Sequence, residues 1–477
     1  MRARALLLTL ALFAGACADE APPVRPHVVF ISVDDLLPQL GCYGVGDAHT
    51  PNIDSLAMEG ALFQGAYAQF AQCGPSRASV LTGLLPERCG VLRNDADYRA
   101  TIGDQLVLPE LFREAGYRSL SLGKVHHGYG ASDDERAWSE APWRPERWQR
   151  WYASEEARAT QRAAEAEVPE AQRSFVRAVI EDHADVDDSE FPDALIAEEA
   201  IRLIEEHSRE GARAGERLFL AVGFLKPHLP FVSPQRFWDI HEGTNRVLQG
   251  KAPRGAPGLA LHDSPELRAY LDVPNEGPFS ADLATRLLRG YRACASFVDA
   301  QIGRVMAALE EHGMSEETIV VLWGDHGWHF NELGLWAKQT NFEQALRVPL
   351  LIRGGGVRAG EVRELVELVD IYPTLASLAG LEAPLGLDGR DLSLPLRSGE
   401  WPEERLAPRS QYPRQGAMGR SVRDAERRYT EWERDGEVIA TELYEARPGV
   451  NEERNLARDK PQELTQMRAL LRARFKL

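Results

Sequence analysis

In this 477-residue sequence, residues 27–33 are His27-Val28-Val29-Phe30-Ile31-Ser32-Val33, and Asp34-Asp35 follow directly. The run is dominated by β-branched and aromatic residues and lacks the alternation of a half-exposed strand, so it predicts a strand buried on both faces. Open α/β sheets form their ligand sites at the carboxyl ends of such strands. The stretch therefore predicts a parallel α/β sheet with carboxylates at its edge.

Four further apolar runs have the same character and are expected to be buried parallel strands: 119–122, 218–224, 318–323 and 348–352. Helical patterns lie between them, for example over 106–115, 194–206 and 284–311. Alternating strands and helices predict a doubly wound, mostly parallel α/β sheet flanked by helices.

Three of these runs end in residues suited to a chemical site. In chain order they are followed by Gly123-Lys124-Val125-His126-His127, by Lys226-Pro227-His228 and by Gly324-Asp325-His326-Gly327. Because parallel strands end at one edge, we expect these side chains to meet Asp34 and Asp35 there. The three aspartates offer hard oxygen ligands for a divalent cation such as Ca²⁺ or Mg²⁺. The alternative for the adjacent pair is that one carboxylate caps a helix and the other is solvated.

The main domain is expected over 27–400, with two excursions from it. Residues 133–215 are charged and rich in aromatic residues, and either form a helical excursion packed over the sheet or line a substrate cleft. Residues 237–278 are interpreted as a surface excursion. Residues 401–477 predict a smaller α+β subdomain, with antiparallel strands within 419–433 and 437–444 and a closing helix over 461–475.

The amino terminus has the pattern of an export signal. Arg2 and Arg4 precede an apolar run from Ala5 to Ala14, and small residues lead to Cys17. Residues 1–16 are therefore interpreted as a signal peptide, either of the ordinary or of the lipoprotein type, with 17–26 as a linker. A lipidated Cys17 would tether the protein to a membrane. The expected location is periplasmic, membrane-anchored or secreted.

Net charge and cysteine content exclude some classes of protein. The net charge of -18 argues against a nucleic-acid partner, which requires a basic face. An anionic substrate would then need a locally cationic pocket. Five cysteines do not make a disulfide scaffold. If Cys17 is lipidated and Cys73 is modified, at most one disulfide can form, and the pairing among Cys42, Cys89 and Cys294 stays open.

The stretch Cys73-Gly74-Pro75-Ser76-Arg77 continues as Ala78-Ser79-Val80-Leu81-Thr82-Gly83. It resembles the sulfatase signature, in which Pro and Arg at these offsets direct conversion of the cysteine to formylglycine. A buried cysteine before a helix would explain Cys73 and Pro75 alone. The rest of the chain is similar to the sulfatase branch of the alkaline phosphatase superfamily, and within it to the iduronate-2-sulfatase group, at Val33-Asp34-Asp35-Leu36, Thr50-Pro51-Asn52-Ile53-Asp54, Lys226-Pro227-His228-Leu229-Pro230-Phe231, Gly324-Asp325-His326-Gly327 and Trp336-Ala337-Lys338.

This resemblance implies an alkaline phosphatase-like catalytic domain over 27–400 and a role for each matching residue. A Ca²⁺ would be held by Asp34, Asp35, Asp325 and His326, and touched by the formylglycine at position 73. Arg77 and Lys124 would orient the hydrated aldehyde, and His127 would take its proton. His228 and Lys338 would bind the sulfate and assist the leaving oxygen, although Lys338 could also be a solvated lysine on a helix face and His228 merely a loop residue. A formylglycine-generating enzyme is the implied maturation partner.

Three functions compete at this point. The first is an exported sulfatase acting on sulfated carbohydrate. The second is a phosphonate or phosphate monoester hydrolase, because relatives with formylglycine share this site. The third is a catalytically idle binding protein, which would be expected to lose Cys73 or a metal carboxylate, and none is lost. The identity of the ester and the position of its sulfate are not encoded in a recognisable motif.

Overall fold

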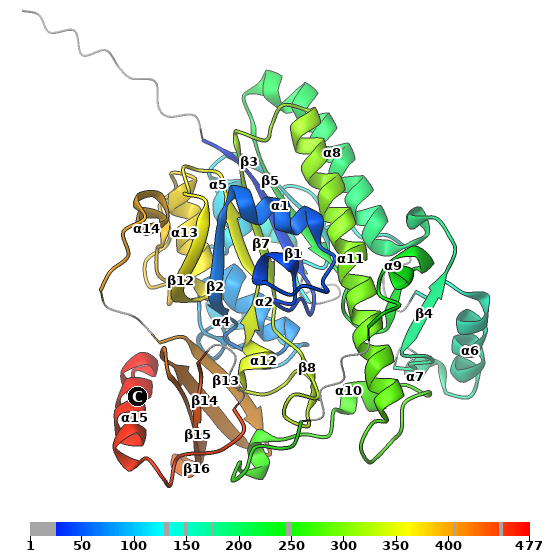
Figure 1. The fold of residues 1–477 in the computed structure, drawn as a ribbon. Helices are drawn as coiled ribbons and strands as arrows, with labels where there is room; N and C mark the ends of the chain where they lie inside the picture. Colours follow the sequence, from blue (N-terminus) through cyan, green and yellow to red (C-terminus); the bar gives the residue numbers. More distant parts are fainter. Residues whose placement is uncertain are drawn as a thin grey trace, which may run out of the picture.

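The computed structural model describes residues 25–127, 133–146, 151–173, 175–244, 250–403, 407–447 and 452–477. The interpreted signal peptide and Cys17 lie outside these residues. The centre of the protein is an eight-stranded sheet in the order β10-β2-β11-β7-β1-β5-β3, with β12 also paired to β2 (Figure 1). Its strands are β1 His27–Val33, β2 Ala61–Tyr67, β3 Tyr117–Gly123, β5 Arg217–Phe224, β7 Thr318–Gly324, β10 Arg347–Val348, β11 Leu350–Arg353 and β12 Gly360–Glu367.

Strand β1 has the bounds that the sequence predicted. It runs parallel to β5 and β7, so that Val33 pairs with Phe224 on one side and with Gly324 on the other. Strand β3 continues the parallel order on β5, where Gly123 pairs with Gly223. Four adjacent strands therefore end level with one another at a single edge, as predicted.

The prediction of a parallel strand over 348–352 is wrong in direction. The structure divides this run at Pro349 into β10 and β11, and β11 runs antiparallel to both β7 and β2. The chain leaves β7 at the carboxyl edge and re-enters the sheet without a crossover helix, so the returning strand must run backwards. The remaining pairing keeps the sheet mostly parallel.

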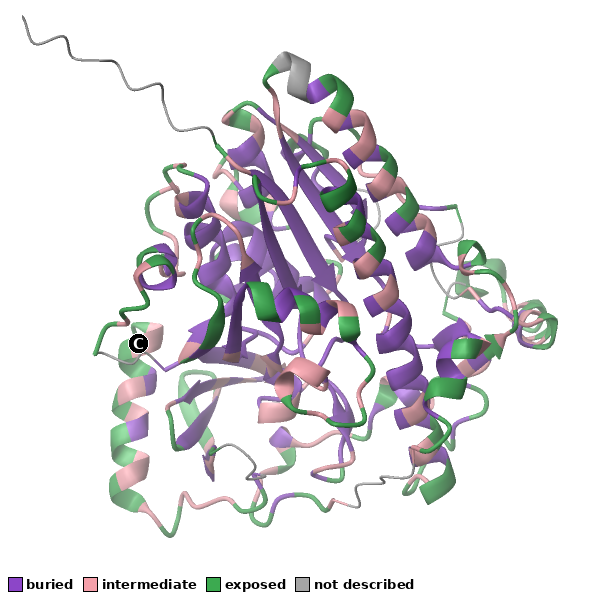
Figure 2. Ribbon diagram, turned by 45° about the horizontal axis from the view of Figure 1, so that its top comes forward, coloured by how far each residue is buried: buried purple, intermediate pink, exposed green. Residues whose placement is uncertain are grey.

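Alternate residues of β1 pack against two layers of helices. Val29 and Ile31 belong to a buried cluster with residues of α1, α8 and α11, whereas Val28 and Phe30 pack with residues of α2, α5 and α13. In Figure 2 the strands are buried, and the outward faces of α8 and α11 are exposed. This α/β/α arrangement confirms the predicted fold class. The helices are α1 Pro51–Glu59, α2 Cys73–Thr82, α3 Pro86–Cys89, α4 Arg99–Ile102, α5 Leu108–Glu114, α8 Pro192–Ala214, α11 Ala281–Glu311, α12 Glu343–Leu346, α13 Ile371–Leu378 and α14 Ser393–Ser398.

The two excursions pack beside α11. Trp138 and Tyr152 are buried in hydrophobic clusters, and Trp143 and Trp151 pack against such clusters, so these aromatic residues contribute to the packing of the excursion. Trp148 lies outside the described residues. The elements here are α6 Glu155–Ala166, α7 Glu170–Arg173, β4 Glu181–Ala184, β6 Phe231–Pro234, α9 Gln235–Ile240, α10 Pro265–Arg268 and the short pair β8 His329–Phe330 and β9 Trp336–Ala337.

A second sheet of four antiparallel strands follows the main domain, in the order β13-β14-β15-β16. Its strands are β13 Arg409–Arg414, β14 Ala417–Arg423, β15 Arg427–Arg434 and β16 Glu437–Glu445. The region 419–433, expected as one strand, is two strands joined by a tight turn, and β13 was not predicted. Helix α15, Pro461–Phe475, has the predicted bounds and packs on β14 and β15.

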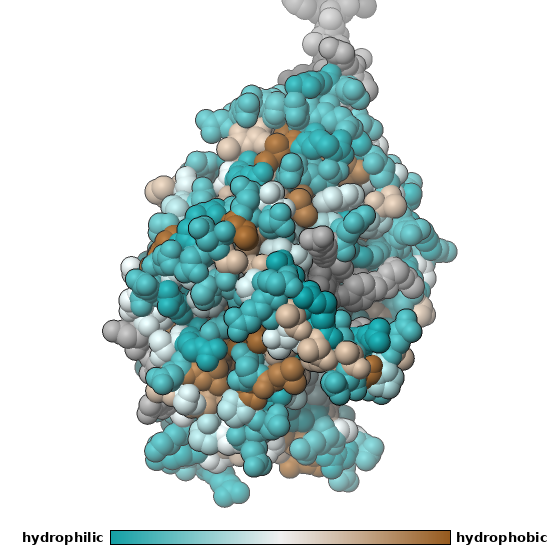
Figure 3. Space-filling model, turned by 90° about the vertical axis from the view of Figure 1, so that its right-hand side faces the viewer, coloured by the Kyte–Doolittle hydropathy of each residue, from teal (hydrophilic) through white to brown (hydrophobic). Residues whose placement is uncertain are grey.

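The face on the right of Figure 1 is mostly hydrophilic, with small separate apolar patches (Figure 3). Among the described residues, no helix combines the length and apolar character needed to cross a membrane. Within this part of the chain, Cys42, Cys73, Cys89 and Cys294 are free thiols.

Candidate active site

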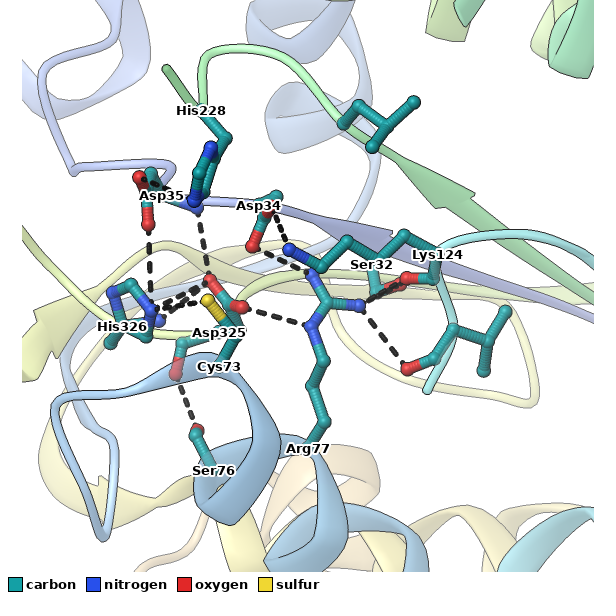
Figure 4. A network of polar contacts seen from close by, with 12 residues as sticks. Ser32, Asp34, Asp35, Cys73, Ser76, Arg77, Lys124, His228, Asp325 and His326 are labelled. Carbon is teal, nitrogen blue, oxygen red and sulfur yellow. Dashed lines mark hydrogen bonds and ion pairs between the residues drawn. The ribbon is translucent and has the colours of Figure 1, made fainter. Parts of the chain in front are cut away.

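The predicted site residues meet at the carboxyl edge of β1, β3 and β7. Asp34 and Asp35 follow β1, Lys124 follows β3, and Asp325 with His326 follows β7. Figure 4 shows the side chains of Asp34, Asp325, His326 and Cys73 pointing toward one another. The level strand ends described above are the reason, since each strand carries its polar residues to the same height in the sheet.

Cys73 is the first residue of α2 and is 1% exposed. Its Sγ lies 3.2 Å from His326 Nε2 and 3.5 Å from Lys338 Nζ. Burial and then the negative charge of Asp34 raise the pKa of the thiol well above its ordinary value. An unmodified Cys73 is therefore a neutral thiol and a poor nucleophile.

Arg77 lies one helical turn further along α2 and connects the strand ends. Its Nε donates to Asp325 Oδ2 at 2.9 Å, its Nη2 lies 3.4 Å from Asp34 Oδ1, and its Nη1 donates to Ser32 Oγ at 3.2 Å. Burial alone would lower the pKa of Arg77, but Asp325 and Asp34 together raise it. The guanidinium thus stays charged while fully buried.

Lys124 forms a close ion pair with Asp34 Oδ2. Burial opposes ionisation of Asp34, but the surrounding cations, Lys124 foremost, hold the pKa of this carboxyl well below its usual range. Conversely, burial would lower the pKa of Lys124, and the charge of Asp34 raises it. Both groups remain ionised at the base of the site.

Asp35 adopts a left-handed conformation, with φ at 59°. Aspartate tolerates this region better than most residues, and the turn lets the Asp35 backbone N–H donate to Asp325 Oδ1 at 3.0 Å. Lys338 Nζ donates to Asp35 Oδ1 at 2.9 Å. Among the described residues, no hydrogen-bond donor reaches the buried Asp35 Oδ2, and His228 Nε2 lies 3.9 Å from this oxygen.

This geometry fits a divalent cation. Ligand atoms of Asp34, Cys73, Asp325 and His326 lie within 4.8 Å of one another, as do those of Asp35, Cys73 and His228. Ca²⁺ binds oxygens at about 2.3–2.6 Å, so ligands on opposite sides of the ion are about 5 Å apart. Within the described part of the chain, Asp35 Oδ2 is a buried oxygen without a hydrogen-bond partner, and Gly327 O lies 3.1 Å from His326 Nδ1, which leaves Nε2 to accept.

His228 and Lys338 close the outer side of the site. His228 lies in the loop after β5, where Lys226 Nζ donates to the His228 carbonyl at 3.0 Å and to that of Pro230 at 2.6 Å. Lys338 follows β9 and is buried, with Nζ 5.6 Å from the ring centroid of Trp328. Its pKa is raised well above the usual value, because the charges of Asp35 and neighbouring groups outweigh burial. Neither residue is a solvated surface group.

The two adjacent histidines differ. His127, half-buried, lines a cavity of about 20 Å³ with Arg77 and Gly74, and burial followed by the charge of Lys124 lowers its pKa to about 3. His126 is buried and lies between the rings of Tyr98 and Trp138 at 5.9 and 6.0 Å. His126 is thus a core residue.

Glu266 was missed from the sequence. It belongs to α10 in the segment 237–278, which is therefore more than a surface excursion. Glu266 Oε1 lies 3.3 Å from His228 Nε2, and Oε2 lies 3.6 Å from Lys338 Nζ. No local signal marks a carboxylate that is brought to the site only by tertiary folding.

Comparison with known proteins gives the family. Residues 26–381 match the family model described as Sulfatase. Iduronate 2-sulfatase of Mus musculus is 32% identical over 479 residues, which covers 85% of this chain and 84% of that protein. The chain therefore belongs to the sulfatase family, and it is a sulfuric ester hydrolase.

Solved structures share the fold. That of BT4656 in complex with its substrate D-glucosamine-2-N,6-O-disulfate has a TM-score of 0.72 at 21% identity and covers 95% of this chain and 98% of its own. The phosphonate monoester hydrolase of Agrobacterium radiobacter has a TM-score of 0.75 at 23% identity, with 95% and 96% covered. At these identities the similarity defines the architecture and leaves the ester open.

Proposed function

We propose that this chain is an exported sulfatase that removes sulfate from sulfated carbohydrate. Its nucleophile would be a formylglycine made from Cys73, and Asp34, Asp35, Asp325 and His326 would hold Ca²⁺, or alternatively Mg²⁺. The observation that carries the proposal is the position of Cys73 Sγ, which lies within the cluster of metal-ligand atoms and is flanked by Lys338. The sulfur stands where an oxygen of the modified residue would lie.

When present, the formylglycine supplies a hydroxyl nucleophile that the thiol cannot, and the cation supplies positive charge toward the sulfate oxygens. The protein contributes fixed charges of its own. Arg77, Lys124 and Lys338 are all buried and cationic, but each is ion-paired with Asp34, Asp35 or Asp325, so the bound cation would supply the positive excess that attracts an anion in a protein of net charge -18. Because they are already ion-paired and fixed, little reorganisation is needed when charge develops.

Two histidines would move protons. His127 lines the cavity beside Gly74 and Arg77, and burial keeps its ring neutral, so we assign to it the proton from the group at position 73; binding of the anionic substrate would have to raise its low pKa for this transfer. His228 is 24% exposed and faces the opening, where Nε2 can donate toward the leaving oxygen. His127 would thus act on the nucleophile, and His228 on the leaving group.

Carbohydrate is the proposed substrate class because two relatives act on sulfated sugars by name, an iduronate 2-sulfatase and the protein bound to D-glucosamine-2-N,6-O-disulfate. Export and a lipid tether at Cys17 are proposed from the pattern of residues 1–17. A formylglycine-generating enzyme is the proposed maturation partner.

The decisive experiment is the mass of the proteolytic peptide containing residue 73, from protein made in its native host or together with a formylglycine-generating enzyme. We expect loss of the sulfur and gain of an aldehyde oxygen. The same preparation should release sulfate from an aryl sulfate faster than it cleaves the matching phosphonate monoester. Unmodified cysteine in an active preparation, or a preference for the phosphonate, contradicts the proposal.

The export proposal needs its own measurement. Mass spectrometry of the mature amino terminus should show cleavage before a diacylated Cys17. A mature terminus further along the chain would remove the lipid tether and leave secretion.

A further inference from the structure

Glu266 occupies a position that the proposed catalysis leaves unexplained. Its carboxylate lies beside the nitrogens of both His228 and Lys338, at 3.3 and 3.6 Å. The side chains of Glu266 and His228 are 17% and 24% exposed, whereas Lys338 is 3% exposed. Glu266 therefore lies on the open side of the site, where the rest of a substrate must enter.

The carboxylate is held in place by its own segment. Ser264 Oγ donates to the carbonyl of Trp336 at 3.1 Å, two residues before Lys338. Leu267 is buried in a hydrophobic cluster, and Arg268 donates to the carbonyls of Pro274 and Gly277 at 2.6 Å each. A side chain anchored on both flanks is preorganised and does not simply follow its cationic neighbours.

The cationic neighbours of Glu266 favour its ionised form. Burial opposes its ionisation, but Lys338 and then His228 hold the pKa of the carboxyl far below its ordinary value. An ionised carboxylate is a hydrogen-bond acceptor only. It cannot hydrogen-bond to a sulfate oxygen, whereas the lone pairs that His228 and Lys338 leave unused are available to a donor on another part of the substrate.

We propose that Glu266 is a specificity-determining residue, which accepts a hydrogen bond from the hydroxyl or ammonium group nearest the cleaved sulfate and disfavours a second anionic group there. This inference rests on the proposed function, because it assumes that His228 and Lys338 bind the sulfate. It defines the substrate class as a sugar that carries the reacting sulfate next to a free hydroxyl or amino group.

The test compares two substrates on the same enzyme. One is the methyl glycoside monosulfate that the enzyme cleaves best, and the other is its counterpart in which the nearest hydroxyl is also sulfated. Release from the shared position is followed by NMR. We expect the wild type to prefer the monosulfate in kcat/KM, and Glu266→Gln to lower this preference at least about tenfold.

The ratio separates specificity from positioning. If Glu266 only held His228 and Lys338, both rates would fall together and the preference would stay the same, which would overturn the proposal. Asp263→Asn is the matched control, since Asp263 lies on the same segment, is exposed and pairs with Arg268 at the surface. It should leave the preference unchanged.

Binding supplies a second readout that does not require the modified residue. In the Cys73→Ala background, calorimetry should show tighter binding of the monosulfate than of the disulfate, and Glu266→Asp should retain this order. A reversed order would overturn the inference. If the wild type released no sulfate from any ester, the proposed function would have failed, and the binding order would still test Glu266.

Discussion

Two sets of buried charges stabilise different parts of this protein, and they differ in how completely their oxygens are used. Where the C-terminal sheet meets the main domain, Glu343 accepts from Tyr67 and Arg428, and Glu452 accepts from Arg428 and the Glu343 backbone. Within the sheet, Glu442 accepts from Trp432 and Tyr444 at 2.6 Å each. Each of the six carboxylate oxygens has a donor.

At the edge of the main sheet, by contrast, Asp35 Oδ2 is buried and, within the described part of the chain, has no hydrogen-bond donor. Natural proteins rarely leave such an oxygen without a partner, because its desolvation is uncompensated. Burial and ion pairing are common to both regions and therefore do not distinguish them. This oxygen belongs to a carboxylate that is grouped with Cys73 and His228, and the combination of an unused oxygen with these ligand atoms suits the region to bind a cation.

The comparison is tested most strongly at Cys73. Cys73→Ala should reduce the turnover of an aryl sulfate by at least about a thousandfold, because the proposed nucleophile is lost. The matched control is Cys89→Ala, which removes another buried thiol in α3 and should keep turnover. Retained activity in Cys73→Ala would place the nucleophile elsewhere.

Asp35→Asn should lose the bound cation and about a hundredfold in activity. The substitution replaces one carboxylate oxygen by an NH2 group, which cannot bind the cation, and leaves the other as a neutral and weaker ligand. Metal content after dialysis would be measured by mass spectrometry, together with the loss of activity in EGTA and its recovery in Ca²⁺. The control is Glu442→Gln, which changes a carboxylate whose two oxygens both have hydrogen-bond donors. This variant should keep the cation bound at the active site. Equal metal in both variants would contradict the assignment of the site.

Arg428→Met should act on stability and leave metal binding unchanged. It leaves Glu343 and Glu452 buried without their shared cation, which is expected to lower the free energy of unfolding by about 3–5 kcal/mol. Urea unfolding measures this loss. Adding Glu452→Gln to this variant removes one buried charge that has lost its cation, and it should restore part of the lost free energy of unfolding. An Arg428→Met variant as stable as the wild type would show that this network is dispensable.

Glu442 predicts a pH dependence. Burial raises its pKa from 4.5 to about 7, so the folded state binds its proton more tightly than the unfolded state. The contribution of this group to stability is full below pH 4.5 and is lost as the pH rises through about 7. Glu442→Gln should flatten the pH dependence of unfolding between pH 5 and 8 by about 1–3 kcal/mol. Parallel curves would mean that Glu442 is not protonated in the fold.

Much of this arrangement is visible in the sequence, because strand, turn and motif are local. The run ending in Asp34-Asp35 and those ending in Lys124 and in Asp325-His326 predicted both the buried strands and their shared edge. The direction of β11 was not predictable from its apolar residues, because direction depends on where the chain re-enters the sheet. Strands β2 and β12 were missed for a similar reason, since their pairing joins distant segments.

The site shows the same division. Residues attached to a strand end or to the Cys73 motif could be named beforehand. Glu266 could not, since it lies 38 residues after His228 and 72 before Lys338 and meets them only after folding. The saturation of Glu343, Glu442 and Glu452 is likewise invisible in the sequence, because it depends on the donors that surround each oxygen.

All ten residues of α2 are buried, including Cys73 at its start. A second protein cannot reach a side chain enclosed in this way, so the proposed conversion of Cys73 has to occur while the chain is still extended. During synthesis of the protein, modification of Cys73 then competes kinetically with folding. A molecule that folds before Cys73 is modified would keep the unmodified thiol and stay inactive. The specific activity of a preparation would then report the rate of modification relative to the rate of folding.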